Sequence, residues 1–169
     1  MTAATFQSTV NVNLGFGVPG ELIVDGPQRV DSLTLDNTGG TIGLAFTKSS
    51  TTNIATQGGV IVDGTNLFAG ILVNPKAYAS FGTGSAPLDP TLFLGPNTQG
   101  EFLTMGTIVV TLVGAAEIGD LVQYNETTGV LSAITPGTSP ASGFALVPNA
   151  VVWNYAQTAT GLAAIRLTN

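Results

Sequence analysis

The chain has 169 residues, and its ten acidic residues against four basic ones give a formal net charge of −6. This balance argues against a nucleic-acid partner, because neutralising phosphates requires clustered Lys and Arg. Charged residues make up only 8% of the chain and the mean hydropathy is +0.40. A free monomer would therefore have few charged side chains on its surface, and we expect protein partners to cover much of that surface.

The N-terminal residues 1–9 carry one large anchor, Phe6, and no secretory signal, so we interpret them as a contact arm. Residues 10–14 alternate apolar and polar side chains, which is typical of a half-buried strand. The pattern G-x-G-x-x-G then follows over residues 15–20, around Phe16. A dinucleotide site would need a helix after it. Residues 22–25 instead predict a short strand, so the glycines indicate a turn between two strands.

Further short strands are expected along the chain, separated by turns rich in Asp, Asn and Gly. Leu33 and Leu35 alternate with polar residues, and the following D-N-T-G indicates an Asx-type turn. Residues 74–100 contain too many Gly and Pro residues for an ordinary connection, and their apolar side chains favour a long docked loop over disorder.

The second half of the chain repeats the strand pattern. Residues 108–113 form a β-branched run suited to a strand buried on both faces, and residues 121–124 and 130–134 predict a hairpin. Val151, Trp153 and Tyr155 share one face of a predicted strand, and residues 161–168 predict a closing strand with Arg166 on its polar side. Helical periodicity is scarce. We therefore expect an all-β fold: a single domain over residues 10–169, an antiparallel jelly roll or β-sandwich with long loops and the N-terminal arm.

Little in the sequence supports catalysis. Without His or Cys the chain lacks the commonest general base, thiol nucleophile and zinc ligand. The acidic residues sit in or beside turns, where exposed carboxylates are ordinary. We therefore expect no catalytic residue, no cofactor and no metal, and a protein that is not an enzyme. No stretch of about 18 apolar residues occurs, so no membrane span is expected either.

Several stretches resemble the structural cement proteins of tailed bacteriophages. They occur in order along almost the whole chain: LGFGVPGE (residues 14–21), FAGILVNPKAYASFGT (68–83), EFLTMGTIVV (101–110), IGDLVQYNETTGVLSA (118–133) and the terminal GLAAIRLTN. The resemblance implies a jelly-roll decoration protein, made in the host cytoplasm, that binds the outer surface of an HK97-type capsid as a homodimer or homotrimer. Its partner would be the major capsid protein, whose subunit contacts it would stabilise.

The residues expected to make these contacts are Phe6, Phe16, Pro75, Lys76 and Tyr78. For Tyr78 a second interpretation stays open, in which the side chain packs on its own domain. A different function also stays open: a carbohydrate-binding or adhesin-like β-sandwich would present Trp153 and Tyr155 as a stacking platform beside turn carboxylates. In the cement interpretation these two residues form part of the core.

Overall fold

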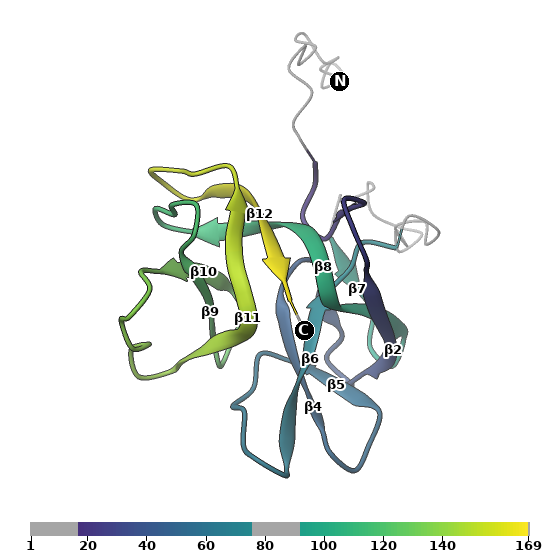
Figure 1. Cartoon of the computed structure of the whole chain (residues 1–169). Helices are drawn as coiled ribbons and strands as arrows, with labels where there is room; N and C mark the ends of the chain where they lie inside the picture. The colour runs from purple at the N-terminus through teal and green to yellow at the C-terminus, as the bar shows by residue number, and fades with distance from the viewer. Residues whose placement is uncertain (1–16, 76–91, 169) are drawn as a thin grey trace, which may run out of the picture.

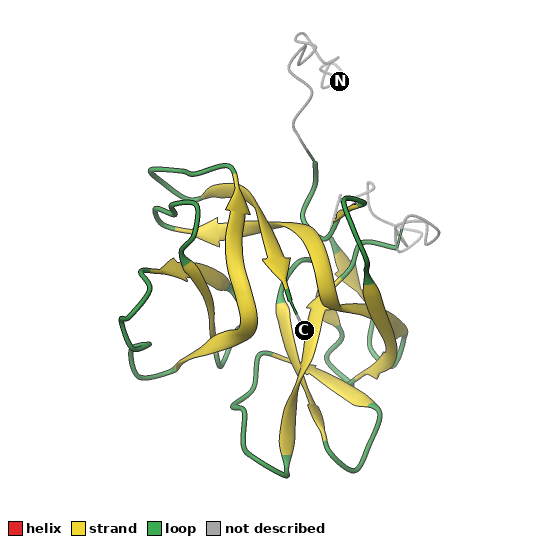
Figure 2. Cartoon of the chain, viewed as in Figure 1, coloured by secondary structure: helices red, strands yellow, loops and turns green. Residues whose placement is uncertain are grey.

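The computed structural model describes residues 17–75 and 92–168, and every regular element among them is a β-strand (Figures 1 and 2). The first half of the chain forms β1 (Leu22–Ile23), β2 (Arg29–Leu35), β3 (Gly40–Thr41), β4 (Ala45–Ser49), β5 (Ile54–Gln57) and β6 (Asn66–Leu72). The second half forms β7 (Phe93–Leu94), β8 (Gln99–Val113), β9 (Leu121–Asn125), β10 (Leu131–Ile134), β11 (Phe144–Asn154) and β12 (Gly161–Leu167).

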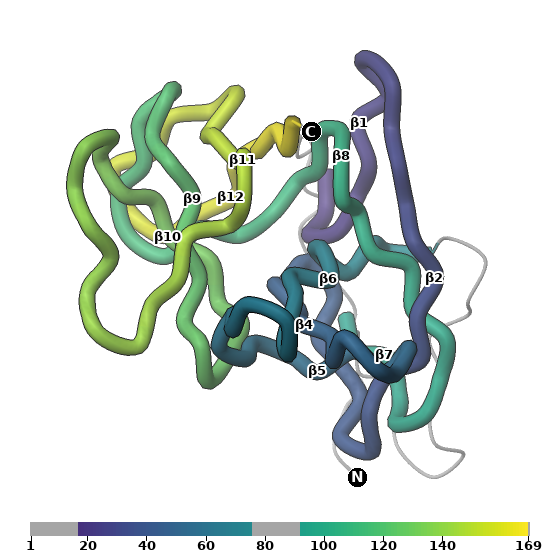
Figure 3. Tube along the Cα trace, turned by 60° about the horizontal axis from the view of Figure 1, so that its bottom comes forward, coloured from purple at the N-terminus to yellow at the C-terminus, as the bar shows by residue number. Residues whose placement is uncertain are grey.

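Strand β8 is the axis of the fold, because both of its edges are paired at both of its ends. Near its C-terminal end, Leu112 has Gly161 of β12 on one side and Leu131 of β10 on the other. Near its N-terminal end, Leu103 has Val30 of β2 and Ile71 of β6 as neighbours. The strand thus belongs to two sets of neighbours, which lie on either side of it in Figure 3.

Each set closes on itself. The strands β8, β12, β11, β9 and β10 form one closed circuit, which we call the C-terminal barrel, and β8, β2, β5, β4 and β6 form a second one, the N-terminal barrel. A closed circuit with an odd number of strands cannot alternate direction throughout. The parallel pairs β8–β10 and β2–β5 supply the exception in each barrel.

Alternation along the shared strands divides the apolar side chains between two cores. Phe46, Leu72 and Phe102 point into the N-terminal barrel, where Phe46 and Phe102 contact edge to face at 5.1 Å between ring centroids. Their neighbours in sequence, Ile71 and Leu103, belong to the other core, together with the interior of the C-terminal barrel. Successive strand residues point to opposite faces, so β6 and β8 contribute to both cores at once.

The all-β class is confirmed, whereas the jelly-roll or sandwich arrangement is not. The predicted hairpin is β9–β10, with Leu131 opposite Tyr124, and the predicted closing strand is β12, whose Ala163, Ile165 and Leu167 are buried. The expected long loop over residues 74–100 contains β7 and the first residues of β8 at its end. The arm, the strand at 10–14 and residues 76–91 lie outside the described residues.

The glycine-rich stretch ends in a turn, as predicted. The Glu21 N–H donates to the Val18 carbonyl at 3.0 Å, and Gly20 has a φ of 82°. Pro at the second and a positive-φ Gly at the third position are typical of a type II turn. Strand β1 that follows is shorter than the predicted 22–25, because Asp25 turns away into the loop before β2.

Candidate contact surface

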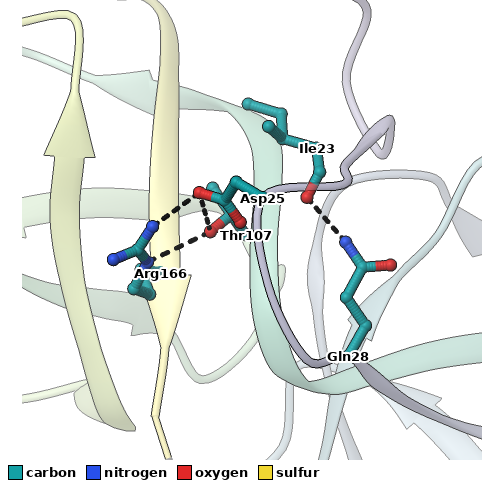
Figure 4. Close-up of polar contacts among 5 residues, drawn as sticks. All are labelled: Ile23, Asp25, Gln28, Thr107 and Arg166. Carbon is teal, nitrogen blue, oxygen red and sulfur yellow. Dashed lines mark hydrogen bonds and ion pairs between the residues drawn. The ribbon is translucent and has the colours of Figure 1, made fainter.

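A polar cluster fixes the loop that connects β1 to β2 (Figure 4). Arg166 of β12 places its Nη2 2.5 Å from Oδ2 of Asp25, and its Nε donates to the Thr107 hydroxyl of β8 at 3.2 Å. The same hydroxyl donates to Asp25 Oδ2 at 3.1 Å. Three segments that are far apart in sequence, residues 25, 107 and 166, therefore meet at one carboxylate.

The charge state of the cluster follows from these contacts. The hydrogen bond from Arg166 is the largest influence and lowers the pKa of Asp25, the Thr107 hydroxyl lowers it further, and desolvation acts in the opposite direction. Asp25 is therefore ionised at neutral pH, with Arg166 as its counter-charge. Because about a third of each side chain is exposed, with 28% for Arg166 and 31% for Asp25, solvent screens the pair, and we regard it as a positioning contact.

The rest of the loop is held from its other end. The Gln28 side-chain amide donates to the Ile23 carbonyl at 2.6 Å, and Arg29 Nε donates to the Thr104 hydroxyl at 3.0 Å. Val24, the first residue of this loop after β1, has 87% of its surface exposed. An apolar side chain held in water by a fixed loop gains nothing from folding, whereas burial by a partner would be favourable. Val24 is thus a candidate contact residue.

Trp153 lies beside this cluster and is 47% exposed. The expectation that it belongs to the core is wrong: Val152 points inward and is 1% exposed, while Trp153 points outward. The Arg166 guanidinium carbon stands 3.5 Å from the ring centroid, which is a cation–π contact. Tyr155 is also exposed, at 43%. However, Arg166 covers one face of the indole, which disfavours Trp153 as a sugar-stacking platform.

A hollow of about 260 Å³ adjoins the cluster, between the loop at Asp25–Pro27 and strands β8 and β12. Its lining is mostly apolar and includes Met105, Pro27 and Leu167, together with Arg166. Among the described residues no three Asp, Glu, His or Cys side chains gather closely enough to hold a metal ion. The arrangement suits contact with an apolar side chain better than chemistry on a substrate.

Exposed apolar side chains occur on both barrels and not only around Val24. On the C-terminal barrel, Ile118 is 61% exposed between Glu117 and Asp120. On the N-terminal barrel, Ile54 and Leu67 are 46% and 42% exposed. The exposed apolar side chains are thus spread over both barrels, as expected for a chain with so few charged residues.

The residues predicted from sequence are placed only in part. Pro75 is buried three residues after the end of β6. Phe6, Phe16, Lys76 and Tyr78 lie outside the described residues, and the contacts assigned to all five stay predictions. Sequence reasoning missed the Asp25–Arg166 cluster. It predicted turns rich in Asp, Asn and Gly between the strands and placed Arg166 on the polar side of the last strand. The pair is 141 residues apart, however, and neither local pattern points to the other.

The described residues contain no helix that is long and apolar enough to cross a membrane. Comparison with known proteins finds a matching family model and similar solved structures. The family model described as structural cement protein (E217 gp24/Pam3 gp6) matches residues 6–168. A chain of the solved structure entitled "The capsid of Myoviridae Phage XM1" superposes with a TM-score of 0.67 at 18% identity, over 96% of this chain and 97% of that one, and so shares the fold. No curated protein sequence matches.

Proposed function

The chain belongs to the structural cement protein family of bacteriophages, and on this basis we propose that it binds the outer surface of an HK97-type capsid and stabilises contacts between neighbouring major capsid protein subunits. The family match over residues 6–168 carries the proposal. It spans both barrels, so the proposal applies to the whole described fold and not to one barrel alone.

The surface supports the same conclusion. A chain with 8% charged residues that exposes Val24, Ile118 and Trp153 has apolar surface for a partner to cover. Interfaces of permanent assemblies are of this kind, more apolar and less charged than ordinary protein surface. We assign Val24 and the fixed loop around it to such an interface, with the major capsid protein as the partner.

The mechanism needs no catalysis. A protein that binds only the assembled shell stabilises it by mass action, since its binding free energy must be overcome before subunits separate. When one cement protein assembly contacts several capsid subunits, each further contact forms at high effective concentration. Single contacts of modest affinity then add up to firm attachment. Association of the chain with itself, as a homodimer or homotrimer on the capsid exterior, would increase the number of such contacts.

Reconstitution tests the proposal. Expanded capsids from a phage lacking the gene for this chain are mixed with the purified protein, sedimented and heated. We expect the protein to co-sediment in a saturable ratio to the major capsid protein and to raise the temperature at which the capsids open. Unexpanded or dissociated capsid protein serves as the control, because the proposed site exists only on the assembled shell. Failure to co-sediment with any capsid form would contradict the proposed function.

A further inference from the structure

The two barrels meet at a second place besides β8. The segment Gln57–Gly59, at the end of β5, contacts the turn Glu126–Gly129 between β9 and β10, with Ala45 of β4 between them. The Ala45 N–H donates to the Gly129 carbonyl at 3.0 Å, and the Ala45 carbonyl accepts from the Gly58 N–H at 2.9 Å. The Gly59 N–H donates to the Glu126 carbonyl at 2.6 Å. We call residues 45, 57–59 and 126–129 the joint.

Side chains reinforce the joint from both barrels. The Gln57 amide nitrogen donates to the Thr128 carbonyl at 2.7 Å, while its oxygen accepts from the Thr41 N–H at 2.9 Å. From the C-terminal barrel, the Tyr124 hydroxyl donates to the Gly59 carbonyl at 2.9 Å. Tyr124 is fully buried. Its hydroxyl therefore has no water to replace this bond, and loss of the partner would leave a buried donor unsatisfied.

Two glycines let the backbones approach this closely. A Cβ on Gly58 would stand 2.7 Å from the Glu126 carbonyl oxygen, and one on Gly129 would stand 2.6 Å from the Ala45 carbonyl oxygen. Both glycines have positive φ, 70° and 73°. The obstructing atoms are backbone, which cannot rotate away as a side chain can. Any other residue at either position therefore pushes the two barrels apart.

Besides the joint, the barrels are connected by β8 and by the core that Ile71 and Leu103 share with the C-terminal barrel. The pairing of β8 changes at one point. Antiparallel pairing with β12 ends at Gly106, and pairing with β2 begins at Met105. Gly106 itself has a φ of 127°. A strand whose neighbours change at a glycine is a place where bending is easy. The joint lies away from Gly106 and restrains the angle between the two barrels at a second place.

We propose that the joint holds the two barrels at a fixed angle, so that one copy of the chain acts as a rigid brace between two neighbouring capsid subunits, one contacted by each barrel. This rests on the proposed cement function. Each barrel has exposed apolar side chains of its own, Ile118 on one and Ile54 on the other. A stiff connection whose length matches the distance between two sites gives the highest effective concentration for the second contact. A connection that is already rigid before binding also loses little conformational entropy on binding.

Rigidity is tested on the isolated protein with two spin labels. The chain has no cysteine, so Thr52→Cys and Ser139→Cys, both exposed and on different barrels, label it specifically. We expect one narrow distance distribution in the parent and a broadened or shifted one after Gly129→Ala. Gly114→Ala is the matched control, since Gly114 has the same sign of φ, 85°, but nothing within 4 Å of an added Cβ. It should leave the distribution unchanged.

If Gly129→Ala does not fold, the double variant Gln57→Leu with Tyr124→Phe removes the side-chain bonds of the joint while keeping apolar volume. A distribution as narrow in every joint variant that folds as in the parent would overturn the fixed angle. In capsid co-sedimentation without labels, we expect a joint variant to lose roughly tenfold or more in apparent affinity. Unchanged affinity alongside a broadened distribution would overturn the brace. If the parent protein does not bind capsids, the cement function is overturned, and with it the proposal that one copy bridges two subunits. The distances between the labels still test whether the angle between the barrels is fixed.

Discussion

Replacing Gly20 by alanine tests how the sequence builds the turn before β1. Gly20 has a φ of 82°, and a Cβ added there would stand 2.3 Å from Cγ2 of Ile42 and 2.8 Å from the backbone nitrogen of Asn74. The Gly20 carbonyl accepts from that same Asn74 N–H at 2.8 Å. Alanine therefore meets two separate obstacles, an unfavourable backbone conformation and a collision with a backbone atom whose hydrogen bond would have to break or shift.

The two costs can be separated with a matched control. A non-glycine residue in the left-handed region costs about 1–2 kcal/mol, and forcing an extra methyl into a packed site costs roughly 1–3 kcal/mol. Gly20→Ala should therefore lower the free energy of unfolding by about 2–5 kcal/mol. Gly64 also has a positive φ, 75°, but nothing within 4 Å of an added Cβ, so Gly64→Ala should cost only the first part.

Thermal unfolding followed by the fluorescence of Trp153, the only tryptophan, measures both variants. A domain of this size loses about 2–4 °C in Tm per kcal/mol. We expect Gly20→Ala to lower Tm by roughly 5–15 °C and Gly64→Ala by roughly half of that or less. Equal losses in the two variants would refute the role of close packing at Gly20, and no loss in either would refute the turn conformation itself.

Three further predictions concern the contact surface and the joint. Val24→Asp should weaken capsid binding by roughly tenfold or more through loss of an apolar contact. Ser139→Asp adds the same charge at another exposed site and should leave binding unchanged; equal binding by the two variants would exclude Val24 from the interface. The pKa of Asp25, followed by NMR of its carboxyl carbon, should lie below the ordinary value of 3.8 and return towards it in Arg166→Gln. The pair therefore stabilises the fold above pH 3.8 and loses this effect as the pH falls through the lowered pKa; an unchanged pKa in the variant would contradict the cluster. Burial raises the pKa of Tyr124 to about 12 from the ordinary value of 10.0, so the stabilising effect of the neutral hydroxyl is complete below pH 10.0 and is lost as the pH rises towards 12. Alkaline titration should show a late tyrosinate phase that is absent in Tyr124→Phe.

Local patterns sufficed to predict several strands but not how they close. The β9–β10 hairpin and strand β12 were predictable because their alternation and turn residues are contiguous in sequence. The start of β8 at Gln99 was not, since Gly100 and Gly106 interrupt the apolar pattern before the β-branched run. Closure of the two barrels depends on Leu103 and Leu112 having partners on both edges, and sequence contains no local sign of such register.

The candidate surface was less predictable for a related reason. Residues 150–153 are apolar on both faces of β11, so alternation cannot tell which face points inward, and Trp153 was assigned to the wrong one. The Asp25–Arg166 pair joins a turn near the start of the chain to its last strand. Only the fold brings the two together, through the common neighbour Thr107 on β8.

The central claim is that this chain is a structural component of the capsid exterior. Quantitative mass spectrometry of purified virions of the phage that encodes it, with surface labelling of intact particles, tests that claim most directly. We predict a copy number comparable to that of the major capsid protein, with label on the chain before the particles are opened. Absence of the chain from purified virions, or labelling only after disruption, would contradict the account.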